Sequence, residues 1–241
     1  MIFLTGDTHG EFSHVADFCR KMQTTIDDIV IILGDVGLNY YGGKRDRLQK
    51  ELLDSLKTTF FCIHGNHEKR PCNIASYYTK EWHGGQIFVE EAHPNLLFAI
   101  DGEVYELNGL NTIVIGGAYS VDKFRRLQNH WSWWPDEQPS DEIKAKVEKT
   151  LAHHHWTMDI ILSHTTPKKY EPVEAFLPMV DQSTVDSSTE LWLDTIEDRL
   201  KYRHWYCGHY HIEKRIDNLT IMFQSFREFP NMSDFDKSQY R

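Results

Sequence analysis

The chain has 241 residues, of which 40% are hydrophobic and 26% are charged, and its formal net charge at pH 7 is −10. This length and composition are typical of a globular protein and exclude a disordered or collagen-like chain. The negative net charge disfavours non-specific binding to nucleic acids, because a negatively charged protein gains no free energy from the release of counterions from a polyanion.

Neither a membrane span nor a secretory leader is expected. The longest apolar runs, such as residues 29–33, have about five residues, whereas a helix needs ~20 to cross a bilayer. The apolar start of the chain stops at Leu4, which is too short for a signal peptide. The four cysteines show no Cys-x-x-Cys spacing, which favours reduced thiols and a cytoplasmic location.

Five short apolar segments share one pattern, in which Gly or Ser ends the segment and a polar residue follows. Runs of this kind, rich in Ile, Val and Phe, predict buried strands. They cover residues 1–5, 28–33, 59–63, 159–162 and 204–207.

Helical patterns lie between these strands, with apolar residues three or four positions apart. The buried faces of the first three are expected at Phe12, Val15, Cys19 and Met22, then at Leu48, Leu52 and Leu56, then at Ile143, Val147 and Leu151. Ser187 and Glu190 have the spacing of a capping box, which predicts the start of a fourth helix with Leu193, Ile196 and Leu200 facing inward.

Strands that alternate with helices predict βαβ units and a largely parallel sheet. The middle of the chain is different, because residues 86–116 contain four strand patterns and no helix. Turn signals at Asp101-Gly102 and Asn108-Gly109 separate the last three, which predicts a meander. Residues 212–224 predict a hairpin that turns near Asp217-Asn218. We therefore expect one α/β domain over residues 1–241, with two sheets packed face to face and helices outside.

The polar residues that follow the five strands are candidates for one site, because ligands of open α/β sheets bind beyond the carboxyl ends of the strands. Carboxylates, imidazoles and an amide, with no cysteine, suit divalent metals of hard to borderline character. The candidates are Asp7, His9, Asp35, Asn66, His67, His164, His209 and His211.

In chain order these motifs read Gly-Asp-x-His-Gly, Gly-Asp, Gly-Asn-His-Glu, Ser-His and Gly-His-x-His. This order resembles the calcineurin-like metallophosphoesterase superfamily. The chain as a whole is similar to small bacterial and phage members, which share the segment Gly116 to Lys123. The resemblance implies a four-layer α-β-β-α sandwich of two mixed sheets flanked by helices. It also implies hydrolysis of a phosphate mono- or diester by a hydroxide that bridges two divalent metal ions, with manganese expected first and iron, zinc, nickel or magnesium as alternatives.

The resemblance also implies a role for each site residue. Asp7, His9 and His211 match the ligands of one metal, Asn66, His164 and His209 match those of the other, and Asp35 bridges both. His67 matches the histidine that assists the leaving group. Ser/Thr protein phosphatases of the superfamily carry an Asp and an Arg where Leu38 and Asn39 stand here. His67 therefore lacks that carboxylate partner, which disfavours a protein phosphatase of this subgroup.

Residues 117–139 form a segment that is long for a connection, and such segments are commonly lids or binding loops. The segment contains Arg125, Arg126 and three tryptophans. We expect it to cover the metal site and to bring Arg125 or Arg126 to the phosphate, since Arg suits bidentate contact with phosphate. The alternative is a pair of surface arginines at the start of a helix. Tyr40, Tyr41 and Tyr210 are the next candidates for substrate selection.

Two other functions compete with a phosphatase or phosphodiesterase that acts on a phosphate mono- or diester. A non-catalytic scaffold with this fold would be indicated by the loss of a metal ligand or of His67, and all of these residues are present. A nuclease or nucleotide pyrophosphatase is the second alternative. The negative net charge and the lack of a basic stripe make a nuclease less favoured.

Overall fold

The first of two sheets contains the three N-terminal strands predicted above. The structure, a computed structural model, describes residues 1–235. Strands β1 (Ile2–Thr5), β2 (Ile29–Ile32), β3 (Thr59–Cys62) and β6 (His93–Ala99) pair in parallel in this order. The antiparallel strands β5 (Gly85–Glu90) and β4 (Tyr77–Trp82) extend the sheet beyond β6, and β13 (Arg227–Glu228) pairs with β1 at the other edge.

The second sheet is built from the C-terminal half of the chain. Strands β8 (Leu110–Ile115), β9 (Ile160–Ser163), β10 (His204–Cys207) and β12 (Leu219–Ile221) pair in parallel. The antiparallel strands β7 (Val104–Leu107) and β11 (Lys214–Ile216) lie at its two edges. The sheets thus have seven and six strands, and both are mixed.

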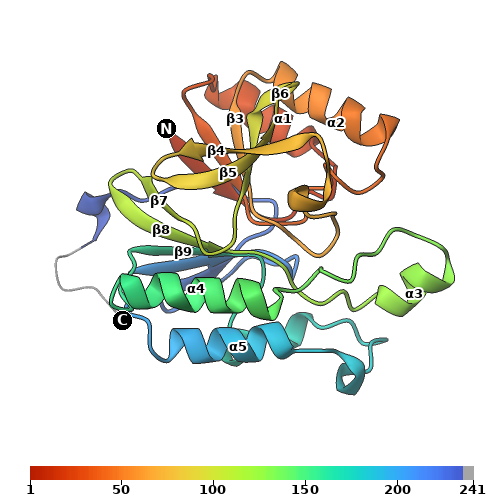
Figure 1. The fold of residues 1–241 in the computed structure, drawn as a ribbon, viewed down its shortest axis with the longest axis vertical. Helices are drawn as coiled ribbons and strands as arrows, with labels where there is room; N and C mark the ends of the chain where they lie inside the picture. Colours follow the sequence, from red (N-terminus) through yellow and green to blue (C-terminus); the bar gives the residue numbers. More distant parts are fainter. Residues whose placement is uncertain (236–241) are drawn as a thin grey trace.

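Helices cover the outer face of each sheet, so that four layers result (Figure 1). Helices α1 (Ser13–Met22) and α2 (Lys44–Ser55) lie on the first sheet, and α4 (Asp141–His153) and α5 (Ser188–Glu197) lie on the second. Helix α3 (Lys123–Gln128) projects to one side. Short 3-10 helices are η1 (Pro71–Asn73), η2 (Lys168–Tyr170), η3 (Val173–Ala175), η4 (Gln182–Thr184) and η5 (Met232–Asp234). No helix in the described part of the chain has the length and hydropathy of a membrane span.

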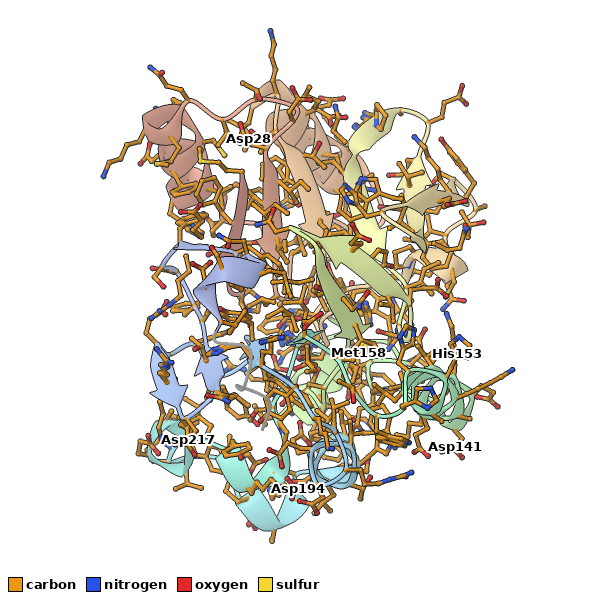
Figure 2. The ribbon with its side chains drawn as sticks, turned by 90° about the vertical axis from the view of Figure 1, so that its left-hand side faces the viewer. Asp28, Asp141, His153, Met158, Asp194 and Asp217 are labelled. Carbon is orange, nitrogen blue, oxygen red and sulfur yellow. The ribbon has the colours of Figure 1, made fainter. Side chains whose placement is uncertain are left out.

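Three apolar layers hold the sandwich together, and Figure 2 shows side chains filling the space between its sheets. The central layer joins Leu4 and Ile31 of the first sheet to Val114 and Leu162 of the second. The two outer layers lie between each sheet and its helices. The predicted α/β fold of two sheets flanked by helices is confirmed, as is the hairpin with Asp217 between β11 and β12.

The predicted meander is wrong at one of its turns. Asp101-Gly102 does not join paired neighbours, because β6 ends in the first sheet and β7 begins in the second. Glycine is needed at this crossing, since Gly102 has a φ of +77°. The chain passes between the layers here because β6 finds a parallel partner in β3, whereas β7 pairs with β8.

Two local predictions about the helices are also wrong. Leu48 and Leu52 are 51% and 47% exposed, because α2 instead turns Leu53 and Lys50 toward the protein. Ser187 precedes α5 but its side chain makes no capping hydrogen bond. Glu190 is buried and accepts a hydrogen bond from Thr165 Oγ1, so tertiary contact has replaced the expected capping box.

Candidate metal centre

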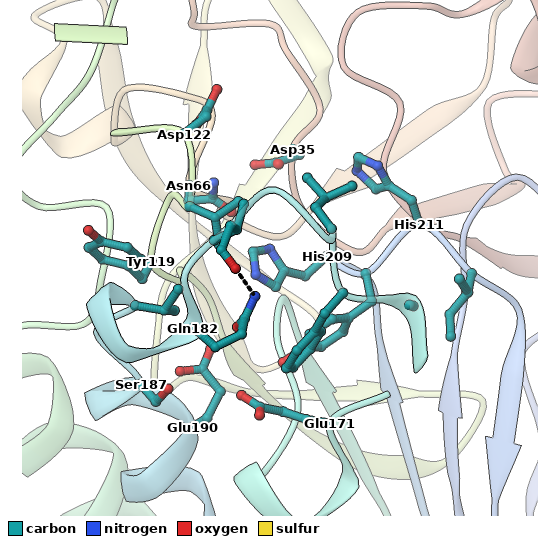
Figure 3. Close-up of a pocket in the computed structure, with 18 of the residues that line it drawn as sticks. Asp35, Asn66, Tyr119, Asp122, Glu171, Gln182, Ser187, Glu190, His209 and His211 are labelled. Carbon is teal, nitrogen blue, oxygen red and sulfur yellow. Dashed lines mark hydrogen bonds between the residues drawn. The ribbon is translucent and has the colours of Figure 1, made fainter. Parts of the chain in front are cut away.

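The loops after β1, β2, β3, β9 and β10 bring the predicted site residues to one edge of the sandwich. Three overlapping groups have their potential ligand atoms within 4.8 Å of one another. They are Asp7 with His9 and His211, His9 with Asp35 and His67, and Asp7 with Asp35 and His164. Figure 3 shows Asp35, Asn66, His209 and His211 around one end of a pocket.

Asp7 connects the first strand to the loop after β10. Its Oδ1 accepts a hydrogen bond of 2.8 Å from the backbone N–H of His209, and its Oδ2 lies 3.2 Å from His211 Nε2. Burial raises the pKa of Asp7, but the nearby His211 and His164 outweigh it and lower the pKa below its ordinary value. A Cβ at Gly208 would lie 2.3 Å from Asp7 Oδ1. Only glycine lets this loop approach the carboxylate so closely.

Asp35 occupies the middle of the cluster and is 2% exposed. Its Oδ1 accepts a hydrogen bond of 2.7 Å from the N–H of His67 and lies 3.5 Å from His164 Nε2. Its Oδ2 lies 3.8 Å from His9 Nε2. Burial opposes ionisation, but the surrounding histidines hold the pKa of Asp35 far below its usual range. The carboxylate thus faces histidines on two sides.

Asn66 and His164 face each other in an arrangement that requires a cation. The Nδ1–H of His164 donates to the carbonyl oxygen of Leu33 at 2.9 Å. Burial lowers the pKa of this ring, but Asp35 and Asp7 outweigh it and raise the pKa above its ordinary value. Asn66 Nδ2 donates to Ser120 Oγ, so Asn66 Oδ1 points at His164 Nε2, 2.8 Å away. At this distance either the protonated Nε2 of His164 donates to Asn66 Oδ1 or both atoms bind a metal ion. The oxygen and nitrogen donors at this position fit a divalent metal.

The remaining histidines supply further imidazole donors. His9 Nε2 and His211 Nε2 lie 2.8 Å apart. Burial, followed by the charge of His164, lowers the pKa of His209 to about 3, so this imidazole is neutral at physiological pH. A neutral imidazole is the form that coordinates metals. The donor set therefore fits metal ions at both ends of the cluster.

The sequence analysis missed a carboxylate beside His67. Asp122 Oδ1 lies 3.7 Å from His67 Nε2, an ion-pair distance that is too long for a hydrogen bond. This oxygen is buried and makes no hydrogen bond within residues 1–235, and Arg126 Nη1 lies 3.9 Å from it. Asp122 lies in the segment Gly116 to Lys123, through which the chain resembles small metallophosphoesterases, so this segment could have indicated the carboxylate.

The two arginines of the segment 117–139 have different surroundings. Arg126 is fully buried, and its guanidinium donates to the carbonyl oxygen of Ser132 and to Ser120 Oγ. Arg125 is exposed, with its guanidinium carbon 5.8 Å from the ring centre of Trp131. Neither arginine lines the pocket beside the cluster. Contact of either with a phosphate stays a prediction, and the structure places Arg126 in the network behind Asn66.

A cavity of about 490 Å³ adjoins the cluster (Figure 3). Tyr119, Val121 and Asp122 of the segment 117–139 line it beside Asn66 and His67. The opposite wall comes from residues 168–187 and the loop at 209–212. Of the three tyrosine candidates, Tyr210 lines this cavity, whereas Tyr40 and Tyr41 line a smaller one with His9 and His67.

Together, the two-sheet sandwich and its strand-end cluster of carboxylates and imidazoles define an α/β protein with a candidate metal centre. A comparison with protein-family models matches residues 1–213 to the calcineurin-like phosphoesterase model, and the chain belongs to this family. The family implies metal-dependent hydrolysis of phosphate esters in general. Among solved structures, TT1561 of Thermus thermophilus aligns with 92% of this chain and 87% of that chain, at 13% identity and a TM-score of 0.49. A comparison with curated proteins found no match.

Proposed function

We propose that this protein hydrolyses a small phosphate mono- or diester with two divalent metal ions. The observation that carries the proposal is the set of three overlapping groups of carboxylate and imidazole atoms within 4.8 Å of one another, and the buried Asp35 belongs to two of these groups. In this proposal Asp7, His9 and His211 would hold one ion, Asn66, His164 and His209 would hold the other, and Asp35 would be a ligand shared by both. When bound, the ions would supply an activated water and neutralise charge on the phosphoryl oxygens.

The side chains around the cluster have separate tasks in this proposal. The N–H of His67 fixes Asp35 Oδ1, and the His67 ring is the proton donor to the departing ester oxygen. Burial lowers the pKa of His67 below its ordinary value, and the nearby carboxylates of Asp35 and Asp122 act against this shift by stabilising imidazolium. General acid assistance of this kind is worth ~10²–10⁴-fold in rate.

A network behind the cluster orients the amide of Asn66. Ser120 Oγ accepts from Asn66 Nδ2 at 3.0 Å and donates to Glu137 Oε2 at 2.6 Å. Because that hydroxyl donates to Glu137, it can only accept from Asn66, and the amide oxygen is left facing the cluster. Such outer contacts fix the orientation of metal ligands.

Manganese is the proposed native metal, and iron, zinc, nickel and magnesium are alternatives that accept the same oxygen and imidazole donors. The four cysteines form no disulfide in the described residues, which supports a cytoplasmic location. A scaffold function is not favoured, because all seven proposed ligands and His67 are present in the sequence and five of those ligands fall into close groups of potential ligand atoms.

The test combines metal content with activity. The protein is reconstituted with Mn²⁺, Ni²⁺, Zn²⁺ or Mg²⁺, and metal per chain is measured by elemental analysis, together with activity on phosphate mono- and diesters. We expect about two metals per chain. Asp35→Asn should lose metal and nearly all activity, whereas His67→Ala should keep its metal. Asp141→Asn, at an exposed residue of α4, serves as the control. Full metal occupancy and activity in Asp35→Asn would refute the proposal.

A further inference from the structure

The cavity beside the cluster contains more space and more apolar surface than a phosphate group needs. Its volume of about 490 Å³ is within the range of sites that hold whole small-molecule ligands. The cluster forms one end of the cavity, and Glu171, Ser187 and Glu190 lie at the other end (Figure 3). A phosphate held by the cluster would therefore leave the remainder of the cavity to the organic group of the ester.

The side wall of this remainder is apolar. It is formed largely by the segment between η2 and α5, and Val121 and Ile212 also line the cavity. The aliphatic and aromatic residues of the segment that line the cavity are Ala175, Phe176, Leu177, Val180 and Val185. The Phe176 ring lies nearly parallel to that of Tyr210, with 20° between planes and 6.3 Å between centroids. Covering such a wall with an apolar group removes apolar surface from water and so favours binding.

The charges at the far end oppose a second phosphate. Lys168 is the only lysine or arginine among the described residues that line the cavity. Its Nζ lies 2.7 Å from Glu171 Oε2 and donates to Ser187 Oγ at 2.9 Å, so its charge is already compensated. Glu190 is buried and accepts from Thr165, and burial raises its pKa to about 7. A carboxyl of this kind is largely neutral at pH 6 and becomes a second negative charge above pH 7.

We propose that this cavity binds a neutral, apolar organic group, alkyl or aryl, of the phosphate ester that the cluster hydrolyses. This inference rests on the proposed function and narrows it. A nucleotide polyphosphate or a polynucleotide would place a further phosphate against Glu171 and Glu190, with no free cation among the described lining residues to receive it. The geometry thus disfavours the nucleotide pyrophosphatase and nuclease alternatives on grounds independent of net charge.

The experiment compares alkyl phosphates whose leaving groups have similar basicity, so that rate differences report binding of the organic group. Ethyl, butyl and benzyl phosphate test the apolar wall. Butane-1,4-diol bisphosphate and 4-aminobutyl phosphate test the far end with a second phosphate and with a cation on the same chain. We expect kcat/KM for benzyl phosphate to exceed that for ethyl phosphate by about ten-fold or more. The bisphosphate should be at least ten-fold poorer than butyl phosphate.

Variants assign the preference to particular walls. Leu177→Ser should reduce the benzyl-to-ethyl ratio several-fold. Val173→Ser should keep it, because Val173 lies in the same segment and is exposed to a similar degree, 67% against 54%, but does not line the cavity. Glu171→Gln removes the partner of Lys168 and should raise the relative rate with the bisphosphate. Its matched control is Glu174→Gln, an exposed glutamate that does not line the cavity.

Binding separates a failure of this inference from a failure of the proposed function. Benzyl and ethyl phosphonate, which cannot be hydrolysed, are titrated calorimetrically into metal-loaded protein. Tighter binding of benzyl phosphonate, lost in Leu177→Ser, supports the apolar pocket even if no ester is turned over. Equal affinities or equal turnover of all esters would overturn it. So would a preference for 4-aminobutyl phosphate, since that result makes the occupant cationic.

Discussion

Asp122 Oδ1 lies 3.7 Å from His67 Nε2, so the histidine after β3 has a carboxylate neighbour that comes from the segment after β8. In the Ser/Thr protein phosphatase subgroup, which the sequence disfavours, the carboxylate would stand at the position of Leu38, which here is fully buried and apolar. Here a histidine and a carboxylate are also neighbours, but the histidine follows a strand of the first sheet and the carboxylate follows a strand of the second. In the proposed mechanism, Asp122 would take the place of the carboxylate that the expected motif lacks beside His67.

The first prediction concerns the pair itself. Asp122→Asn should lower kcat for alkyl phosphates about ten- to a hundred-fold, because their leaving oxygen needs a proton, and should change kcat for p-nitrophenyl phosphate far less. Metal content should remain at the wild-type level. His67→Ala should show the same leaving-group dependence, and the double variant should be little worse than either single one. Equal losses with good and poor leaving groups would show that the pair does not assist proton transfer.

The second prediction concerns the close approach of the loop after β10 to Asp7. Gly208→Ala places a Cβ 2.3 Å from Asp7 Oδ1, so the carboxylate or the loop must move. We expect a lower metal content, measured by elemental analysis, and a smaller rise in Tm on adding Mn²⁺. Gly43→Ala is the control, because its Cβ would meet nothing within 4 Å. Wild-type metal content in Gly208→Ala would show that this approach is not required.

The third prediction is a pH dependence of stability caused by Glu190. Its folded pKa is raised to about 7 by burial, above the ordinary value of 4.5. The folded protein therefore holds the proton more tightly than the unfolded chain, and this contribution to stability is lost as pH rises from 4.5 to 7. Glu190→Gln should gain up to roughly 3 kcal/mol relative to wild type over this window.

Urea unfolding at pH 5 and pH 8, with the same Mn²⁺ concentration for both proteins, measures this difference. Glu174→Gln, which changes an exposed carboxylate, should show no comparable gain. If the stability of Glu190→Gln relative to wild type is the same at both pH values, burial does not raise the pKa of Glu190 in the folded protein.

The fourth prediction separates the two arginines of the segment 117–139. Arg126→Ala removes hydrogen bonds to Ser132 and Ser120 from a fully buried site and should destabilise the protein by about 3 kcal/mol or more. Arg125→Ala should change the free energy of unfolding by less than about 0.5 kcal/mol. Thermal unfolding and steady-state kinetics test both variants. A raised KM in Arg125→Ala at unchanged stability would instead assign phosphate contact to Arg125.

Local patterns located the strands and the candidate site in advance. Short apolar runs that end at Gly or Ser became β1, β2, β3, β9 and β10, and their polar successors meet at one edge of the sandwich. This prediction works within each sheet because parallel strands end on the same side, which brings Asp7, Asp35 and Asn66 to one edge of the first sheet. That this edge meets the strand ends of the second sheet, where His164 lies, was decided by the packing of the two sheets.

The sequence by itself therefore determined the fold class, the candidate metal ligands and the family. Only the tertiary structure decided which neighbours the other polar residues meet. Leu48 stayed exposed, Glu190 turned inward to Thr165, and Asp122 came to lie beside His67. The physical reason is that strand ends are aligned by backbone pairing within a sheet. Contacts between a helix and a sheet, or between loops of two sheets, depend instead on how whole layers pack, which a local pattern does not encode.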